Sequence, residues 1–412
     1  MAKAAVGQIC SSNSMAHNLE QCVKLVGKAA SAGAKVRGVL LLFQPMISTI
    51  PYMRPPDSRW TASATAIGQG TPKLMSQSAG TSLQRLGQGA VFNTTCVGLL
   101  RTSSGRGWMT RFTSFRGLSV SLIDVIFIPL PMAILFLPEA SDYIATSSQE
   151  SMSLAKPVAS SPFVTGLQSA AAKHSIAVHV GIHVPVTVKP ASTDNPAVTS
   201  IPQPEDAAPS DDANATTTTK LYNRTIYITP TGSILESATY NKLHLFDYPA
   251  GGLHESASTQ AGAALTPPVA SPVGRLGSLI CFDVRFAEPA LALAQPPPSS
   301  PFFRDPAQVL LYPSACMAHW EVLLRARAVE TQSYIIAAAQ VGRHNGGKRV
   351  SYGRSLVVDP WGKVVLELKG VREDGEEAEE GAVGQLGVVE VDLDEWERVR
   401  EKMPLVRRTL DF

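Results

Sequence analysis

The sequence predicts an α/β fold whose sheets are mixed. Stretches with apolar residues at helical spacing alternate with short, nearly continuous apolar runs that are typical of buried strands. Two strand-like runs, residues 225–228 and 234–240, are also joined by a Pro-Thr-Gly turn at residues 230–232, which predicts a hairpin. Crossover helices join parallel strands and hairpins join antiparallel ones, so we expect both kinds of pairing.

The first strand-helix unit lies at the N-terminus. Residues 4–11 are expected to form a strand, and a helix follows with Asn18 as its N-cap and Gly33 near its end. A second unit begins with the apolar run 133–137, which stops at Pro138. The unit at the N-terminus and the one at Pro138 thus follow the same strand-then-helix order.

The same alternation continues toward the C-terminus. Helices are expected near residues 161–174 and 320–334. Strands are expected at residues 176–186, 276–281, 309–312, 335–339, 355–358 and 364–368.

Two stretches do not follow this alternation. Residues 36–131 are rich in Ser, Thr, Gly and Arg, nearly lack acidic residues and show no sustained period. Residues 187–219 are rich in Pro, Ala, Thr and Asp, a composition that cannot bury apolar surface. We therefore predict one domain over residues 1–412, with a non-core insertion at about 36–131 and a disordered loop at about 187–219. The insertion is interpreted as translated non-coding sequence, such as a retained intron, or as a disordered insert.

Composition argues against several classes of protein. The 412-residue chain has a formal net charge of +2 and no basic stripe with interleaved aromatics, so no nucleic-acid partner is expected. Five scattered cysteines without CxxC spacing fit neither a disulfide framework nor a zinc site. The most apolar stretch, residues 118–138, is broken by prolines and Asp124, so no membrane span is expected. A strand directly after the initiator Met predicts no leader peptide and a cytoplasmic location, with the mitochondrion as the alternative.

Three chemically active side chains stand where predicted strands end. Cys281 ends an apolar run, a strand-to-turn placement that exposes a side chain at the edge of a sheet. Glu139 and Lys242 each follow another strand. A thiol nucleophile needs a base, and the reaction that it starts needs a positive group where an oxyanion forms. Each residue alone has an ordinary interpretation, as a buried thiol, a solvated carboxylate or a surface lysine, but together they predict one site.

Four segments in the same order resemble a known family. They read FLPEA, YNKLHLFD, LICFDVRF and HWEVLLRARAVETQSYIIAAAQVGRHNGGKRVSYGRSLVVDPWG. The chain resembles the nitrilase superfamily of carbon–nitrogen hydrolases, and within it the deaminated glutathione amidase branch, which some lineages fuse to a Fhit-type domain. The resemblance covers residues 1–35 and 133–412, apart from the loop at 187–219.

The resemblance implies a fold and a set of site residues. The fold is a four-layer α-β-β-α sandwich with two mixed β-sheets, which forms homodimers or higher oligomers through its faces. The catalytic set is Glu139 as general base, Lys242 as oxyanion stabiliser and Cys281 as nucleophile. Glu255 matches a second glutamate of the family, and the backbone N–H of Phe282 is expected to join Lys242 at the oxyanion.

The implied reaction is hydrolysis of a linear small-molecule amide through a cysteine thioester, without a metal or organic cofactor. The expected substrate is deaminated glutathione or a related α-keto acid amide, and an ω-amidase acting on α-ketoglutaramate is the alternative. Arg285 is a candidate for binding a substrate carboxylate. A structural ion pair of Arg285 with Asp283 or Glu288 is held equally open.

Other chemistries are weighed against this one. A papain-like hydrolase would use a histidine as base, and the available candidates are His244, His254 and His319. A metal site at His179 and His183 is less favoured, because the segment alternates like a strand and no third ligand is near in sequence. Both histidines are therefore interpreted as packed or surface residues.

Two departures from the family pattern affect the expected activity. The loop at residues 315–319 is shorter than in the family, where a Phe and a Thr of this loop line the acyl pocket, so the shortening bears on which amide is the substrate. The insertion enters the strand that positions Glu139, so full activity is expected only without it, and an inactive scaffold isoform is the alternative. The charged residues at 325–330 are interpreted as salt bridges that stabilise a helix.

Overall fold

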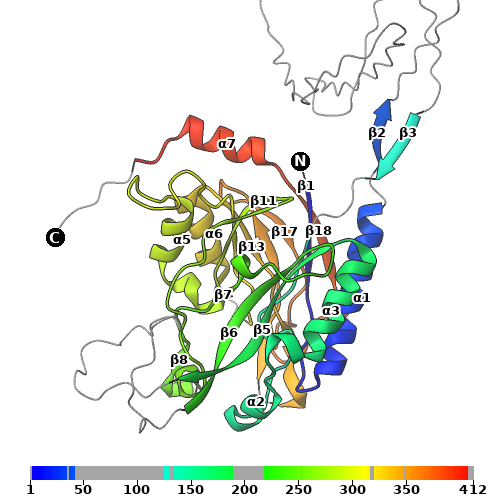
Figure 1. Ribbon diagram of the computed structural model, residues 1–412, viewed down its shortest axis with the longest axis vertical. Helices are drawn as coiled ribbons and strands as arrows, with labels where there is room; N and C mark the ends of the chain where they lie inside the picture. The colour runs from blue at the N-terminus through cyan, green and yellow to red at the C-terminus, as the bar shows by residue number, and fades with distance from the viewer. Residues whose placement is uncertain are drawn as a thin grey trace, which may run out of the picture. The chain divides into compact units, whose positions relative to one another are not determined.

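The computed structural model in Figure 1 describes most of the chain. It describes residues 2–34, 37–41, 125–129, 134–188, 218–251, 253–315, 320–347 and 349–406. The chain divides into two compact units, one formed by Met1–Arg37 with Pro129–Phe412 and the other by Gly38–Ile128. Residues 42–124 of the predicted insertion, and 189–217 of the predicted loop, lie outside the described residues.

The first sheet belongs to the larger unit and is mixed, as predicted. Its order is β18 (Leu386–Val391), β1 (Ala2–Gly7), β4 (Ile134–Phe136), β5 (Ala177–Val188), β6 (Thr218–Ile228) and β7 (Tyr240–Asn241). The three central strands β1, β4 and β5 run parallel, whereas β18, β6 and β7 each pair antiparallel to a neighbour. Strand β4 is therefore held in register on both sides.

The second sheet is mixed in the same way. Its order is β10 (Val269–Ser271), β11 (Gly274–Ser278), β12 (Val309–Leu311), β13 (Tyr334–Ala337), β16 (Leu356–Val358) and β17 (Val364–Glu367). Strands β11, β12 and β13 are parallel and the outer strands are antiparallel. The central strands β12 and β13 are apolar and buried along their whole length, as strands covered on both faces require.

Helices cover the outer face of each sheet, and the two inner faces pack together (Figure 1). Helices α1 (Met15–Ala34) and α3 (Pro162–His174) pack on the first sheet, and α5 (Ala287–Ala294) and α6 (Trp320–Thr331) on the second. Alternation along β4 shows the layering, because Leu135 faces the helices while Ile134 and Phe136 face the other sheet. The result is the predicted four-layer α-β-β-α sandwich.

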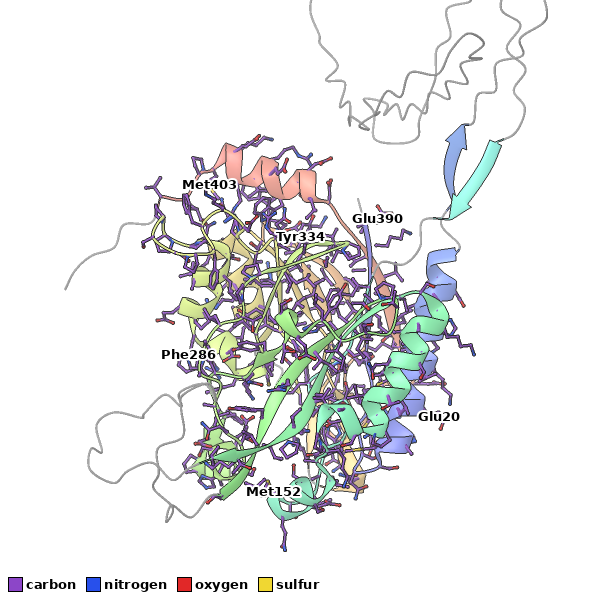
Figure 2. The ribbon with its side chains drawn as sticks, viewed as in Figure 1. Glu20, Met152, Phe286, Tyr334, Glu390 and Met403 are labelled. Carbon is purple, nitrogen blue, oxygen red and sulfur yellow. The ribbon has the colours of Figure 1, made fainter. Side chains whose placement is uncertain are left out.

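Smaller elements complete the larger unit. They are α2 (Ser148–Leu154), α4 (Glu255–Ser258), α7 (Leu393–Lys402), β8 (Asp247–Tyr248), β9 (Leu253–His254), β14 (Val341–Arg343) and β15 (Val350–Tyr352). In Figure 2 Tyr334 lies beside α7, and its hydroxyl donates to Glu395 of that helix at 3.0 Å. Strands β2 (Arg37–Leu41) and β3 (Val125–Pro129) form a two-stranded sheet that, apart from Arg37 and Pro129, belongs to the smaller unit.

Two local predictions were wrong. Helix α1 begins at Met15, so Asn18 is no N-cap; it is buried, and its amide group donates to the carbonyls of Ser12 and Asp142. The predicted hairpin segment at 234–240 pairs with β6 at both ends, through Ile234 opposite Ile228 and through β7, but it is no continuous strand because a 3-10 turn, Glu236–Ala238, interrupts it. Short-range pattern cannot distinguish a continuous strand from one that a turn interrupts.

The two histidines of β5 are packed, as interpreted. His179 lies between the sheets with Nε2 3.2 Å from Oγ of Ser278, and Nδ1 of His183 lies 3.0 Å from Oδ1 of Asp142. Within the described ranges, no three His, Cys, Asp or Glu side chains are grouped as metal ligands. Nor does any helix in those ranges have the length and apolar character needed to cross a bilayer.

Candidate active site

Glu139 is held in a tight turn that follows β4. The backbone N–H of Gly181 on β5 donates to the carbonyl of Pro138 at 3.1 Å, and the N–H of Ser141 donates to the carbonyl of Gly181 at 2.9 Å. A Cβ at Gly181 would lie 2.6 Å from Cα of Glu139, so only glycine permits this approach. Glu139 is buried on this turn, with 7% of its side chain exposed.

Gln340, which follows β13 of the second sheet, fixes the same turn from the other side. Its Nε2 donates to the carbonyl oxygens of Glu139 and Ala140 at 2.9 and 3.2 Å. Its Oε1 accepts from the N–H of Ser11 at 2.9 Å. The carboxylate of Glu139 therefore projects from a backbone that both sheets hold.

Cys281 begins a 3-10 turn, Cys281–Arg285, directly after β11. Its N–H donates to the carbonyl of Pro313 at 3.1 Å, and its φ is +48°, in the left-handed region that L side chains seldom adopt. Such a conformation costs about 1–3 kcal/mol and is often found at functional sites. Cys281 is buried, with 7% of the residue exposed, and its thiol donates a hydrogen bond to the Glu139 carboxylate.

Lys242 follows β7 and is almost completely buried. Its ammonium lies 3.2 Å from Oε1 of Glu139 and 3.0 and 2.9 Å from the two oxygens of Glu255. An ammonium group has three donors, and these three contacts match them in number. The backbone N–H of Lys242 donates to the carbonyl of Asn223 at 2.9 Å, which fixes the start of the side chain.

Glu255, at the start of α4, is the second carboxylate of the cluster. Besides the Lys242 ammonium, it accepts from the N–H of Phe246 at 2.6 Å and from Nδ2 of Asn223 at 3.2 Å. The structure thus brings Glu139, Lys242, Cys281 and Glu255 together from four separate segments.

Two further groups bind the Glu139 carboxylate, and the sequence analysis missed both. Nδ2 of Asn223 on β6 donates to Oε1 at 2.7 Å, and the N–H of Ala315 donates to Oε2 at 2.9 Å. Asn223 pairs in register with His183 across β5 and β6, so a correct strand register would have placed it on this face. The Ala315 donor is a backbone N–H, which nearly every residue has, so the residue type could not have predicted its role.

Electrostatics keep the cluster ionised despite its burial. Burial opposes the charge of Glu139, but the Lys242 ammonium and hydrogen bonds from Cys281, Asn223 and Lys242 hold its pKa below the ordinary value. Burial likewise opposes the charge of Lys242, but Glu139 and Glu255 hold its pKa well above the ordinary value. Glu139 is therefore a carboxylate, and hence a proton acceptor, at neutral pH.

Phe282 and Arg285 lie on the same turn as Cys281. The Phe282 ring packs against that of Phe246 with centroids 5.0 Å apart, and its backbone follows Cys281 directly. Arg285 ends the turn with an exposed side chain. Asp283, considered as its ion-pair partner, is buried and accepts hydrogen bonds from Tyr240 and His244.

The histidines of the papain-like alternative lie as follows. Nδ1 of His244 lies 2.8 Å from Oδ1 of Asp283, and its ring stacks on Phe286. His254 is exposed, and His319 lies outside the described residues. The carboxylate of Glu139, instead, accepts a hydrogen bond from the thiol.

The predicted salt bridges on helix α6 are present. Arg325 pairs with Glu321 at 3.8 Å, and Arg327 pairs with Glu330. The shortened loop at residues 315–319 falls, after Ala315, outside the described residues.

Known proteins resemble this chain in sequence. The profile described as carbon-nitrogen hydrolase matches residues 118–401, more than half of the chain. The probable hydrolase nit2 of Schizosaccharomyces pombe is 36% identical over 283 residues, which cover 66% of this chain and 84% of that protein. Human deaminated glutathione amidase is 49% identical over 156 residues, covering 36% of this chain and 44% of that protein. The chain thus matches about half the length of that amidase.

Solved structures share the fold. The NitFhit protein of Caenorhabditis elegans aligns with a TM-score of 0.56 and 26% identity, over 98% of this chain and 65% of that one. An amidase of the nitrilase superfamily from Nesterenkonia AN1 aligns with a TM-score of 0.51 at 17% identity, over 97% and 95% of the two chains. The match of the family profile and the similarity to the yeast hydrolase show that this chain belongs to the carbon-nitrogen hydrolase family.

Proposed function

We propose that the protein hydrolyses a linear amide to an acid and an amine or ammonia, through a thioester on Cys281. The observation that carries the proposal is the hydrogen bond from the Cys281 thiol to the Glu139 carboxylate, beside the Lys242 ammonium. A thiol, an ionised base and a buried cation are the three groups that acyl transfer from an amide requires.

In the first half of the reaction, Glu139 takes the thiol proton and the sulfur attacks the amide carbon. The carbonyl electron pair moves to oxygen, and the Lys242 ammonium with the N–H of Phe282 stabilises the oxyanion. When the carbonyl re-forms, the carbon–nitrogen bond breaks and Glu139 returns its proton to the departing nitrogen. The acyl group remains as a thioester on Cys281.

The contacts of Lys242 suggest how its ammonium becomes available to the oxyanion. All three donors face carboxylate oxygens, and the longest contact, 3.2 Å, is to Glu139. Protonation of Glu139 removes its negative charge and weakens that contact, so one donor can turn to the oxyanion as it forms. Glu255 keeps the other two donors and holds the ammonium in place.

In the second half, Glu139 takes a proton from water, which attacks the thioester carbon. The carbon–sulfur bond breaks, the acid leaves and the proton returns to Cys281. The same carboxylate thus acts as base and as acid in both halves. Asn223 and the N–H of Ala315 hold it between these roles.

The proposed substrate is deaminated glutathione or a related α-keto acid amide. Relatives named deaminated glutathione amidase, at 49% identity for the human protein and 42% for the bovine one, support this choice. Arg285, exposed at the end of the nucleophile turn, is proposed to pair with the substrate carboxylate. The ω-amidase alternative differs in acting on α-ketoglutaramate.

An assay of α-keto acid release tests the proposal. The full chain is incubated with deaminated glutathione and, separately, with α-ketoglutaramate, and Cys281→Ala serves as the matched control. We expect one of the two to be hydrolysed and Cys281→Ala to lower kcat by at least about 10³-fold. Equal rates of hydrolysis by the wild type and by Cys281→Ala would exclude the thioester route.

We also propose that the protein forms a homodimer through an outer helical face. Val322 and Val329 lie two turns apart on α6 and are 67% and 48% exposed. Trp361 is 51% exposed and directly precedes Gly362, which lies against Val329. Adjacent exposed apolar side chains of this size often mark interfaces. Sedimentation should show a dimer for the wild type and a monomer for Val322→Glu; a monomeric wild type would exclude the proposal.

A further inference from the structure

One buried carboxylate joins the turn that carries Lys242 to the turn that carries Cys281. Asp283 has no exposed surface, and four nitrogen or oxygen atoms lie within hydrogen-bond distance of its carboxylate. Its Oδ2 accepts from the Tyr240 hydroxyl at 2.7 Å and the N–H of Ile280 at 3.0 Å. Its Oδ1 accepts from the N–H of His244 at 2.9 Å and faces Nδ1 of the same residue at 2.8 Å.

The positions of these donors along the chain are informative. Tyr240 and His244 stand two residues before and two residues after Lys242, and Asp283 stands two residues after Cys281. The segment that carries the ammonium is therefore attached on both sides to the turn that carries the thiol.

Aromatic contacts add to this attachment. The His244 ring stacks on Phe286 with centroids 3.7 Å apart and planes 13° from parallel. Because Phe286 directly follows the nucleophile turn, this stacking joins the same two segments as the Asp283 hydrogen bonds do. Hydrogen bonds and stacking together leave the two segments little freedom to move apart.

A carboxylate suits this position better than its amide. Two oxygens without hydrogens can accept from four donors, whereas an asparagine would turn an N–H toward one pair of donors. Burial and the charge of Asp283 raise the pKa of Tyr240 well above its ordinary value, so the phenol keeps its proton and donates. A buried carboxylate with all its acceptor sites filled is stable in this position.

We propose that Asp283 is a positioning residue that sets the distance between the Lys242 ammonium and the Cys281 thiol. The inference rests on the proposed function, in which the oxyanion forms on the carbon that the sulfur attacks and must lie within reach of Lys242. Asp283 itself touches neither the substrate nor the reacting atoms. Its effect is expected on kcat rather than on KM, because the oxyanion exists only after attack.

Two variants test the proposal from opposite sides, with one matched control. Asp283→Asn removes the carboxylate, and Tyr240→Phe removes one donor while keeping the buried ring. Asp359→Asn is the control, since Asp359 is a buried turn carboxylate that accepts from the N–H groups of Trp361 and Lys363, between β16 and β17. Amide hydrolysis by the full chain and alkylation of Cys281 by iodoacetamide, located by mass spectrometry, are the two readouts.

We expect kcat to fall about 30-fold for Asp283→Asn and about 10-fold for Tyr240→Phe, with KM within about 3-fold and the control within about 2-fold of the wild type. The double variant should be no slower than Asp283→Asn, because both changes break the same contact. The proposal would be overturned if the fold-losses in kcat of the two single variants multiplied in the double variant. An equal loss of kcat in the control, or an unchanged kcat in both single variants, would overturn it as well.

The alkylation rate separates failure of this inference from failure of the proposed function. A nearby ammonium favours the thiolate, so a displaced Lys242 should slow alkylation of Cys281 by about 3-fold or more at pH 7. If the wild type hydrolyses neither amide, the proposed function fails, and the alkylation rates alone decide whether Asp283 positions Lys242. Unchanged alkylation in both variants would then exclude that role.

Discussion

Two regions of the larger unit bury ionisable groups, and they do so in opposite ways. At the strand ends, Glu139 and Lys242 are buried as ions beside Glu255. Between the two sheets, His179 is buried with its Nε2 3.2 Å from the hydroxyl of Ser278, and burial lowers its pKa to about 3. The first group is charged at neutral pH and the second is neutral.

The difference follows from what each environment supplies to the charged form. Moving an ion out of water costs several kcal/mol, which only opposite charges and hydrogen bonds can offset. Glu139 has an ammonium, an amide, a backbone N–H and a thiol around it, whereas the sheet interface around His179 is built from apolar side chains. A buried charge in this fold is therefore evidence of a site, and a buried neutral histidine is evidence of packing.

The largest effect should follow from removing the cation of the first region. Lys242→Met leaves two buried carboxylates without their ammonium, so we expect kcat to fall about 10³-fold and the free energy of unfolding at pH 7 to fall by about 3–5 kcal/mol. Urea denaturation and the amide assay measure both. Lys24→Met is the control, because its ion pair with Glu20 is exposed, and it should change neither quantity measurably.

The pH dependence of that variant sharpens the comparison. Without Lys242 the pKa of Glu139 should rise in the folded state, so its protonation stabilises the folded variant, which should lose less unfolding free energy than the wild type between pH 7 and pH 5. A variant that loses stability in parallel with the wild type over this range would contradict the view that Lys242 compensates the two carboxylates.

A smaller effect is expected for Asn223→Ala. This change removes a 2.7 Å hydrogen bond that favours the ionised form of Glu139, so we expect kcat to fall about 10- to 100-fold. Less support for the carboxylate raises its pKa, which shifts the acid limb of the pH–rate profile to higher pH. An acid limb at the wild-type pH would show that Asn223 does not tune the base.

Much of the fold and of the candidate site could be predicted from the sequence. The motifs around Glu139, Lys242 and Cys281 each follow an apolar run, and strand ends at one edge of a sheet lie close in space. The periodic stretches likewise predicted strands such as β5 and helices such as α3. What failed depends on contacts distant in sequence: Asn18 caps no helix, since it bonds to the loop at Asp142.

The roles of Asn223 and Gln340 escaped prediction for a related reason. Asn223 lies in a strand with several polar residues, and the sequence does not show which of them faces the site. Only the register with β5, which pairs Asn223 with His183, fixes the face on which its side chain lies. Gln340 acts across the sandwich on the backbone of Glu139, 201 positions away. Local pattern carries no information about such pairs.

The second region gives a prediction about stability. The pKa of His179 is about 3 in the folded state and its ordinary value is 6.5, so the unfolded chain binds a proton first as the pH falls. The stability that the folded state gains from keeping His179 neutral is complete above pH 6.5 and is lost as the pH falls toward 3. Between pH 7 and 5 it should account for about 2 kcal/mol of lost unfolding free energy.

His179→Gln provides the comparison for that measurement. The variant cannot titrate, so its unfolding free energy should fall less between pH 7 and 5 than that of the wild type, whatever its stability at pH 7. Parallel curves for the two proteins would show that the sheet interface tolerates a charged histidine, and the contrast between the two regions would then be wrong.

The smallest effect is expected from the largest deletion. Both regions lie in the unit formed by Met1–Arg37 and Pro129–Phe412, and we propose that this unit is one hydrolase domain that residues 38–128 merely interrupt. The sequence raised the concern that the insertion disrupts the strand before Glu139, yet β4 pairs with β1 and β5 in register. Joining Arg37 to Pro129 should therefore leave kcat within about 2-fold and the urea midpoint unchanged. A clearly more active deletion variant would mean that the insertion does impair the positioning of Glu139, and a less active one that residues 38–128 contribute to the site.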